Sequence, residues 1–541
     1  MINPADESVL GTVPTATRAD LDDALAAAQR GFAVWRKTSP AKRTQIILKA
    51  ASLIRARVDE MAVAMTLEQG KPLDQARLEI VRGCDIIEWD ATEGLRLYGR
   101  IIPSEEGMRH SVLRQPIGPV AAFSPWNFPM SSPGRKVAGA LSAGCSIILK
   151  ASEETPAGAV QLVRAFHDAG LPPGVLNLVF GNPAEISEYL IPQSSIRLIT
   201  FTGSIPVGKK LAEMAGRYMK PAIMELGGHA PVIVCDDVDP LATAATSVAG
   251  KSRNAGQVCV SPTRFFVQES IYDKFANAFA EKAAQLKVGD GLDPSMQMGP
   301  LANSRRIDAM ETLVADAKSK GARVLAGGSR IGNRGYFFPL TVLADVPDDA
   351  RAMREEPFGP LALVNPVRNL DEAIEKAQFV ALWARRLCLH ALGAERQPSG
   401  GRYRGRQSLD QSFRCIRGRN AVRRRKGLGL WTGRRDGRPA ILYGRQERLA
   451  QDDLIAELPA PPPAGSDRCK ISEVTPRWLP AHPAALVLRS RWRSQEPALR
   501  SRSIIANEPK TPKSWWRRLR PRAAARSPLP PMCLAAPMSP R

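Results

Sequence analysis

Four short segments hold the residue types that can do chemistry: Pro125-Trp-Asn-Phe-Pro129, Phe201-Thr-Gly-Ser204, Met224-Glu-Leu-Gly-Gly228 and Asn254-Ala-Gly-Gln-Val-Cys259. Cys259 follows Gly256 and Gln257, a flexible approach that suits an accessible sulfur, and a thiolate can add to a carbonyl carbon. The alternative is a buried free cysteine, which is the usual place of this residue. That alternative is kept for the other three cysteines of the same region: Cys84, Cys145 and Cys235.

In this order, the four segments resemble the aldehyde dehydrogenase superfamily, and most closely its succinate-semialdehyde dehydrogenases. The resemblance runs from about Asn3 to Lys376, with 34 positions between Glu225 and Cys259. Each segment alone is weak evidence for the family, but the four segments in this order are specific to it. The resemblance implies NAD(P)-dependent oxidation of an aldehyde to its carboxylic acid.

The resemblance gives three residues catalytic roles. Cys259 is expected to form a thiohemiacetal with the aldehyde and then a thioester. Asn127 and the backbone N–H of Cys259 are expected to bind the oxyanion, which needs donors aimed at it; alone, Asn127 would read as a turn residue. Glu225 is expected to activate water for thioester hydrolysis. Its apolar and glycine-rich neighbours predict burial, which raises a carboxyl pKa; pairing with a nearby cation is the alternative.

The same resemblance places a nicotinamide cofactor on a strand-to-helix turn at Gly203 and Gly208, where free N–H groups can face a pyrophosphate. Lys150 and Glu153 are expected at the adenine ribose. A carboxylate there accepts from both ribose hydroxyls and repels a 2′-phosphate, which favours NAD, with NADP possible. The full expected set is Ser124, Pro125, Trp126, Lys150, Ser152, Glu153, Gly203, Ser204, Gly208, Leu226, Glu356 and Phe358.

Substrate choice is expected to depend on two arginines. Arg135 and Arg253 match a pair that holds the distant carboxylate of the substrate in succinate-semialdehyde dehydrogenases. Two guanidinium groups near an apolar tunnel are costly without an anionic ligand. The alternative is that they pair with local acids. Succinate semialdehyde or a similar semialdehyde is therefore the expected substrate.

Hydrophobic periodicity predicts an alternating α/β protein. Leu21, Leu25, Ala28, Phe32 and Trp35 mark one face of a helix, and Ser39 before Pro40 caps a second. Short apolar runs then alternate with helical stretches, which predicts a Rossmann-like parallel sheet and, after it, a second α/β catalytic domain. The predicted strands are 145–149, 175–180, 197–202, 231–235 and 264–268. The predicted domains are 1–228 for the cofactor and 229–376 for catalysis.

Composition narrows the class of protein further. No run reaches the ~18 apolar residues of a membrane span, and no signal peptide is visible, which favours a cytoplasmic protein. The eight scattered cysteines do not suggest a disulfide framework, and five histidines without a HExxH or CxxC pattern suggest no metal site.

The charge is divided abruptly along the chain. Residues 1–376 hold 42 basic and 42 acidic residues, whereas residues 377–541 hold 34 basic and 11 acidic ones and so carry the whole net charge of +23. The resemblance to the family stops at this boundary. If suitable codons are chosen for residues 377–383, 421–438 and 442–451 and the reading frame is moved forward by one base, the translation gives three segments like those of the family, in the family's order. We therefore expect 377–541 to be an out-of-frame, disordered tail rich in arginine and proline, replacing the end of the catalytic domain and the family's oligomerisation strand.

Two functions from different classes follow. The first is an aldehyde dehydrogenase, acting on a small-molecule aldehyde. The second is an inactive or misfolded frameshift product whose tail binds polyanions without specificity. Specific nucleic-acid binding is not expected, because the tail lacks a helix-turn-helix, finger spacing or an aromatic RNA-binding set.

Overall fold

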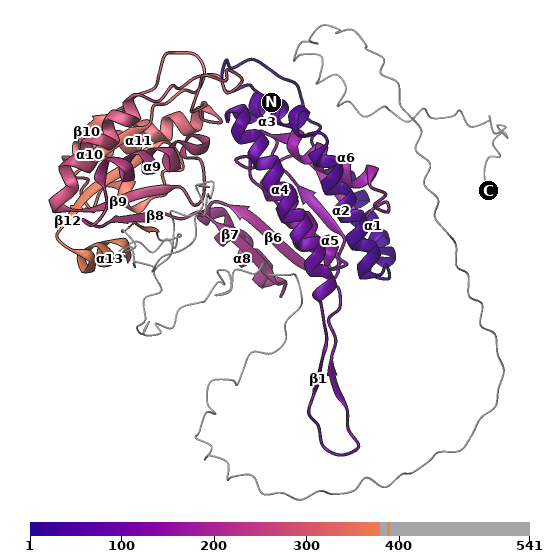
Figure 1. Cartoon of the computed structure of the whole chain (residues 1–541). Coiled ribbons are helices and arrows are strands. Elements are labelled where there is room, and N and C mark those ends of the chain that lie inside the picture. The colour runs from indigo at the N-terminus through magenta and orange to yellow at the C-terminus, as the bar shows by residue number, and fades with distance from the viewer. Residues whose placement is uncertain (379–386, 390–541) are drawn as a thin grey trace, which may run out of the picture. The chain divides into compact units, whose positions relative to one another are not determined.

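The computed structural model describes residues 1–378 and 387–389 of the chain (Figure 1). Two β-sheets organise these residues, each covered by helices. A first sheet has the strand order β5-β4-β3-β6-β7, and a second has the order β10-β11-β12-β9-β8-β13. This is the α/β architecture with parallel sheets that the sequence predicts.

Every pair in the first sheet is parallel. The chain builds β3, β4 and β5 outward and then returns to place β6 beside β3. The strand order therefore reverses between β3 and β6, and ligands of open α/β sheets bind at the carboxyl ends of the strands at such a point. The strands are β3 (Val120–Phe123), β4 (Ile147–Lys150), β5 (Leu176–Val179), β6 (Leu198–Gly203) and β7 (Ala222–Leu226).

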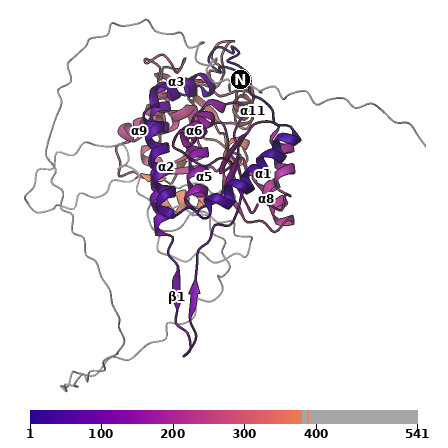
Figure 2. The ribbon, with the colours of Figure 1, turned by 90° about the vertical axis from the view of Figure 1, so that its right-hand side faces the viewer.

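Alternate residues of this sheet enter two different cores. Val120 and Ala122 of β3 pack into one cluster, whereas Ala121 and Phe123 pack into the other. Both faces are thus dry, which explains the continuous apolar runs of these strands. The covering helices (Figures 1 and 2) are α1 (Arg18–Trp35), α2 (Pro40–Arg55), α3 (Val58–Gln69), α4 (Leu73–Glu93), α5 (Ser131–Ser142), α6 (Pro156–Asp168), α7 (Pro183–Leu190) and α8 (Ile205–Arg217).

The second sheet follows directly, since only Gly227, Gly228 and His229 separate β7 from β8. Its pairs are parallel except for β10 with β11. The strands are β8 (Ala230–Val234), β9 (Pro262–Gln268), β10 (Arg323–Ala326), β11 (Thr341–Ala344), β12 (Leu361–Val367) and β13 (Leu387–Leu389). The helices are α9 (Pro240–Ser252), α10 (Glu269–Ala284), α11 (Ser304–Ser319), α12 (Arg351–Arg354) and α13 (Leu370–Gln378).

The local signals of the sequence are visible in the elements. Ser39 accepts a hydrogen bond from the Lys42 N–H at 3.3 Å and so caps α2, as predicted. The predicted strand 145–149 is β4, shifted by one or two residues, and the predicted strand 231–235 is β8. A two-stranded antiparallel hairpin, β1 (Arg100–Ile102) with β2 (His110–Val112), was not predicted and extends away from the helices (Figure 2).

Residues beyond the predicted boundary at 376 take part in the fold. Helix α13 continues to Gln378, and buried Arg264 donates to the carbonyl of Ala377 at 3.3 Å. Strand β13 pairs in parallel with β8. The backbone edge of β8 can accept a strand of many sequences, because pairing uses N–H and C=O groups. The rest of the predicted tail, including the expected loss of the oligomerisation strand, lies outside the described residues.

No helix within the described residues is long and apolar enough to cross a membrane.

Candidate active site

The carboxyl end of the first sheet and the amino end of the second supply the predicted catalytic residues. Asn127 follows β3, and Glu225 lies in β7. Cys259 precedes β9, and Glu356 precedes its parallel neighbour β12, so their loops lie at the same edge of the second sheet. The short link between β7 and β8 joins the two edges. Residues far apart in the sequence can thereby act on one substrate.

The loop before Cys259 has an unusual backbone. Asn254, Ala255 and Gly256 have φ angles of 49°, 51° and 69°, in the left-handed region. Asparagine and glycine tolerate this region, whereas alanine does so only at a cost. The Asn254 N–H donates to Oε1 of Gln75 at 2.8 Å, and the Gln257 side chain accepts from the Ala302 N–H at 3.0 Å. These contacts hold the strained turn in place.

Cys259 is exposed, unlike Cys84 and Cys145, which are buried as the alternative reading predicts; Cys235 is half-buried. Protein atoms around the sulfur still desolvate it, and this burial raises the pKa of the Cys259 thiol, with Glu356 and Glu225 adding to the rise. The backbone N–H of Cys259 and the cation of Arg135 act in the opposite direction. An acceptor for the thiol proton is therefore needed near neutral pH.

Asn127 is buried, and its side chain is close to the nucleophile loop. Its Nδ2 donates to the Gln257 carbonyl at 3.0 Å, two residues before Cys259. Within residues 1–378, this is the only hydrogen bond of that nitrogen, so its second N–H is available for an oxyanion. The structure thus brings Asn127 to the loop of Cys259.

The predicted burial of Glu225 is wrong. Its side chain is exposed and the other four residues of β7 are only half-buried, because the described residues cover the faces of this strand incompletely. Glu225 nevertheless acts electrostatically on Cys259 and on buried Lys136, so it lies near the reaction centre. A role for Glu225 as a base therefore depends on this proximity rather than on burial.

Glu356 is a carboxylate near Cys259 whose pKa is raised by burial. Burial raises the pKa of Glu356 to about 7, against opposing effects from the Gly228 N–H, Arg306 and Lys251. Its carboxylate lies on Gly227, where a Cβ would sit 1.9 Å from Oε2. The sequence does not reveal this contact, since 129 positions separate the two residues.

Several unsatisfied groups fit a nicotinamide cofactor. The Ser124 hydroxyl and Oε1 of Glu356 are buried without a hydrogen-bond partner among the described residues. Ser204 is the N-cap residue of α8, but its side chain makes no capping hydrogen bond, which leaves the first N–H groups of this helix for an anion. Buried polar groups without partners are rare in folded proteins, so a polar ligand suits this site.

The remaining predicted cofactor residues surround the same strand ends. Lys150 forms an ion pair with Glu153, and Glu153 also accepts from the Gly181 N–H at 3.2 Å. The rings of Trp126 and Phe358 meet edge to face with centroids 5.5 Å apart. Gly208 allows Leu226 to approach, since a Cβ there would lie 2.3 Å from Leu226 Cδ2. Of the others, Pro125 and Gly203 are half-buried and Ser152 is buried.

Arg135 and Arg253 lie close enough to Cys259 to interact with its charge. Arg135 is exposed on α5, and Arg253 is half-buried, with its guanidinium carbon 6.0 Å from the centroid of the Phe128 ring. Both act electrostatically on Cys259, and Arg82 lies close enough to lower the pKa of Arg253, after the larger effect of burial. Neither Arg135 nor Arg253 forms an ion pair with an acid in the part of the chain that the structure describes.

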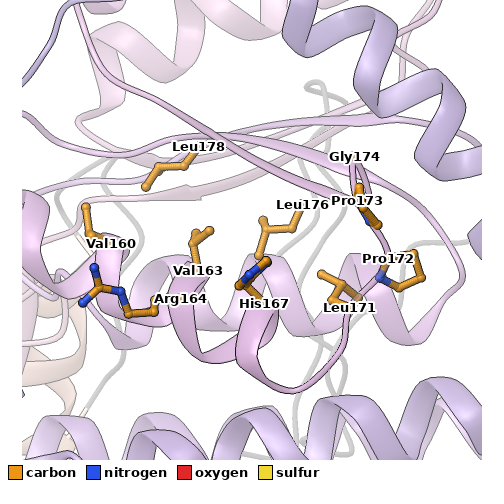
Figure 3. Close-up of a pocket in the computed structure, with 10 residues that line it drawn as sticks. All are labelled: Val160, Val163, Arg164, His167, Leu171, Pro172, Pro173, Gly174, Leu176 and Leu178. Carbon is orange, nitrogen blue, oxygen red and sulfur yellow. The ribbon is translucent and has the colours of Figure 1, made fainter. Parts of the chain in front are cut away.

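A separate cavity of about 320 Å³ lies on the outer side of α6 and β5 (Figure 3). Arg164 and His167 are its polar side chains, and its lining includes none of the predicted site residues. It has no nucleophile or carboxylate and therefore does not compete with the Cys259 site.

Comparisons with known proteins show the family of this chain. The sequence model of the aldehyde dehydrogenase family matches residues 1–380. The 4-(hydroxymethyl)benzenesulfonate dehydrogenase TsaD1 of Comamonas testosteroni is 46% identical over 376 residues, which cover 69% of this chain and 78% of that protein. The succinate-semialdehyde dehydrogenase [NADP(+)] GabD of Escherichia coli (strain K12) is 41% identical, over 70% and 78% of the two chains.

A solved structure gives the same result for the fold. The succinate-semialdehyde dehydrogenase of Burkholderia pseudomallei has a TM-score of 0.69 and 39% identity, covering 70% of this chain and 79% of that one. Residues 1–380, which the family model matches, include the first sheet, all strands of the second sheet except β13, and the loops that carry the predicted site. The chain therefore belongs to the aldehyde dehydrogenase family of NAD(P)-dependent oxidoreductases.

Proposed function

We propose that this chain oxidises an aldehyde that carries a second, anionic group, with succinate semialdehyde as the reference substrate. The observation that supports this most directly is the pair Arg135 and Arg253, which interacts electrostatically with Cys259 and forms no ion pair with an acid of the described residues. A guanidinium that forms no direct ion pair with an acid favours a carboxylate or sulfonate ligand. The relatives named above are called dehydrogenases of a semialdehyde and of a benzenesulfonate, both of which are anions.

In the proposed reaction, the Cys259 thiolate attacks the aldehyde carbon. Asn127 Nδ2 and the Cys259 N–H stabilise the oxyanion of the resulting thiohemiacetal. Bound NAD(P)+ would supply the hydride acceptor that the oxidation requires. Glu225 then takes a proton from the water that hydrolyses the Cys259 thioester, which releases the acid and the free thiol.

The cofactor proposal favours NAD over NADP. The Glu153 carboxylate, which the family resemblance assigns to the adenine ribose, is held by Lys150 and by the Gly181 N–H. A fixed carboxylate accepts hydrogen bonds from ribose hydroxyls but repels a 2′-phosphate. GabD carries NADP(+) in its name, so both cofactors belong in the assay.

The test compares anionic with neutral aldehydes of similar shape: succinate semialdehyde with butanal, and 4-formylbenzenesulfonate with benzaldehyde. Reduced cofactor is followed by absorbance, with NAD+ and NADP+ in parallel. Arg135→Met and Arg253→Met should each lower kcat/KM for the anionic aldehydes by about 10- to 100-fold, as expected for a lost charged hydrogen bond. The neutral aldehydes should change by less than about threefold.

Two controls separate the possible failures. Arg217→Met removes an exposed arginine that pairs with Glu213 on α8 and should leave all four substrates unaffected. Equal losses for charged and neutral aldehydes would exclude the arginines as an anion site. If no aldehyde gives turnover above Cys259→Ala, the alternative of an inactive frameshift product is favoured instead.

A further inference from the structure

A buried ion pair lies beside the candidate oxyanion site. Lys71, between α3 and α4, forms it with Glu79 on α4, and their side chains are 1% and 2% exposed. Removing two charges from water is expensive, and a buried pair is often no more stable than apolar side chains of the same size. Burial is also the main cause that lowers the pKa of Lys71. The position of the pair therefore needs an explanation other than stability.

Glu79 fixes the start of α5. Its Oε1 accepts from the N–H groups of Met130 and Ser131, at 3.1 and 3.2 Å. Met130 occupies the N-cap position of α5 and makes no side-chain capping bond. The carboxylate from α4 thus takes the place of a local cap, where a negative charge is also favourable to the helix dipole.

Lys71 fixes the residues immediately before this helix. Its Nζ donates to the Asn127 carbonyl at 2.8 Å and lies 4.4 Å from the centroid of the Phe128 ring. Nδ2 of Asn254, in the nucleophile loop, donates to the same carbonyl at 3.2 Å. The segment from Asn127 to Ser131 is thereby held from both sides, and the loop of Cys259 is attached to it.

We propose that the Lys71–Glu79 ion pair positions the Asn127 amide as an oxyanion donor. The inference rests on the proposed function, because it assigns a task within the same reaction. The carbonyl that Lys71 binds belongs to Asn127 itself, so a shift of this peptide moves the side-chain amide with it. Oxyanion stabilisation depends on placing the donor within a few tenths of an ångström, which explains why a stiff, charged contact is used.

The opposing interpretation is that the pair merely caps α5 and keeps the domain folded. The two interpretations differ in which reactions of Cys259 they affect. Acylation by p-nitrophenyl acetate passes through an oxyanion: the Sγ–carbonyl bond forms, and the ester C–O bond then breaks to release p-nitrophenolate. Alkylation by iodoacetamide forms an S–C bond as iodide leaves, without an oxyanion. A positioning residue affects the first reaction much more than the second.

The experiment uses the full chain and measures both reactions, with Cys259→Ala as the baseline. Lys71→Met should slow acylation at least tenfold while alkylation stays within about twofold. Glu79→Gln, which keeps an oxygen for the N–H groups of α5 but loses the charge facing Lys71, should act in the same direction. The matched control is Arg77→Met, which breaks the exposed ion pair between Arg77 on α4 and Asp59 on α3 and should change neither rate.

A double-mutant cycle with Asn127→Ala completes the test. Asn127→Ala should slow acylation by about 10²-fold or more. Lys71→Met should add almost nothing in that background, because the group it positions is gone. Additive effects, or equal losses of acylation and alkylation, would overturn the proposal in favour of a structural role. If Lys71→Met does not fold, Glu79→Gln carries the same cycle.

The Cys259→Ala baseline also distinguishes failure of the positioning role from failure of the proposed function. A wild-type chain whose acylation does not depend on Cys259 overturns the proposed function, and the positioning role falls with it. Normal acylation in the wild type together with normal acylation in Lys71→Met and Glu79→Gln overturns the positioning role alone.

Discussion

At the scale of single residues, the reactivity of Cys259 reflects a balance of charges. Burial raises its thiol pKa, Glu356 and Glu225 raise it further, and Arg135 lowers it. Glu356→Gln should therefore lower the thiol pKa, and Arg135→Met should raise it. Below the pKa, the thiolate fraction sets the alkylation rate, so Glu356→Gln should react about two- to threefold faster and Arg135→Met correspondingly slower.

The measurement is the rate of iodoacetamide alkylation from pH 6 to 10, whose midpoint reports the thiol pKa. Cys259→Ala gives the background from the other cysteines. Glu356 has a pKa of about 7, so its charge, and with it its effect on Cys259, should diminish below that pH. The curves of Glu356→Gln and the wild type should therefore converge toward pH 6. Identical midpoints in all three proteins would show that neither side chain acts on the sulfur.

Single residues also show what the sequence can and cannot reveal. The types at Cys259, Asn127 and Glu225 indicate the chemistry, because each side chain suits one step of aldehyde oxidation. The exposure of Glu225 depends on how far other elements cover the faces of β7, which local sequence does not encode. Lys71 and Glu79 lie outside every recognised segment. The contact of Lys71 with Asn127 spans 56 positions, and the contacts of Glu79 with Met130 and Ser131 span 51 and 52.

At the scale of elements, the turn before Cys259 depends on Gly256. Its φ is 69°, and a Cβ would lie 2.1 Å from the Gly359 carbonyl oxygen, a backbone atom that cannot move aside cheaply. Gly256→Ala should therefore separate the nucleophile loop from the segment that precedes β12. We expect a loss of about 1–3 kcal/mol in the free energy of unfolding and at least a tenfold loss of acylation rate.

Chemical denaturation and the p-nitrophenyl acetate assay measure these two effects. Gly250→Ala is the matched control, because Gly250 lies on α9, six positions upstream, with its nearest neighbour 3.7 Å from a Cβ. Alanine should raise stability there by about 0.5–1 kcal/mol, since glycine weakens a helix. A Gly256→Ala protein as stable and reactive as wild type would contradict the proposed close approach of the two loops.

The elements themselves are the part of the fold that local sequence predicts best. The strand of 145–149 and the cap at Ser39 are short-range patterns, and the structure places β4 and α2 there. The order of strands is less accessible, because β6 returns beside β3 across 74 residues of intervening chain. The β1–β2 hairpin also escapes prediction, since its residues are mostly exposed and show no apolar alternation.

At the scale of the whole molecule, the division of charge along the chain remains the strongest sequence feature. Residues 1–376 are neutral, and the entire +23 lies beyond them. Within the described residues, α13 and β13 use only the start of that segment. We propose that one base inserted near codon 377 shifts the reading frame. This would account for the charge and, with suitable codons, for three family-like segments in the neighbouring frame.

This hypothesis makes a prediction about two proteins that differ by one base. Deleting a single base near codon 377 should give a chain that continues with family-like sequence and loses the arginine-rich tail. Binding of many basic side chains to a polyanion weakens steeply as the salt concentration rises. The original chain should therefore elute from heparin at a much higher salt concentration than the edited one. The edited chain should also show a higher Cys259-dependent rate of aldehyde oxidation per milligram, since its catalytic domain would be complete. Resequencing codons 365–390 checks the cause directly, and a gene without an extra base relative to close relatives would overturn the hypothesis whatever the activities of the two chains.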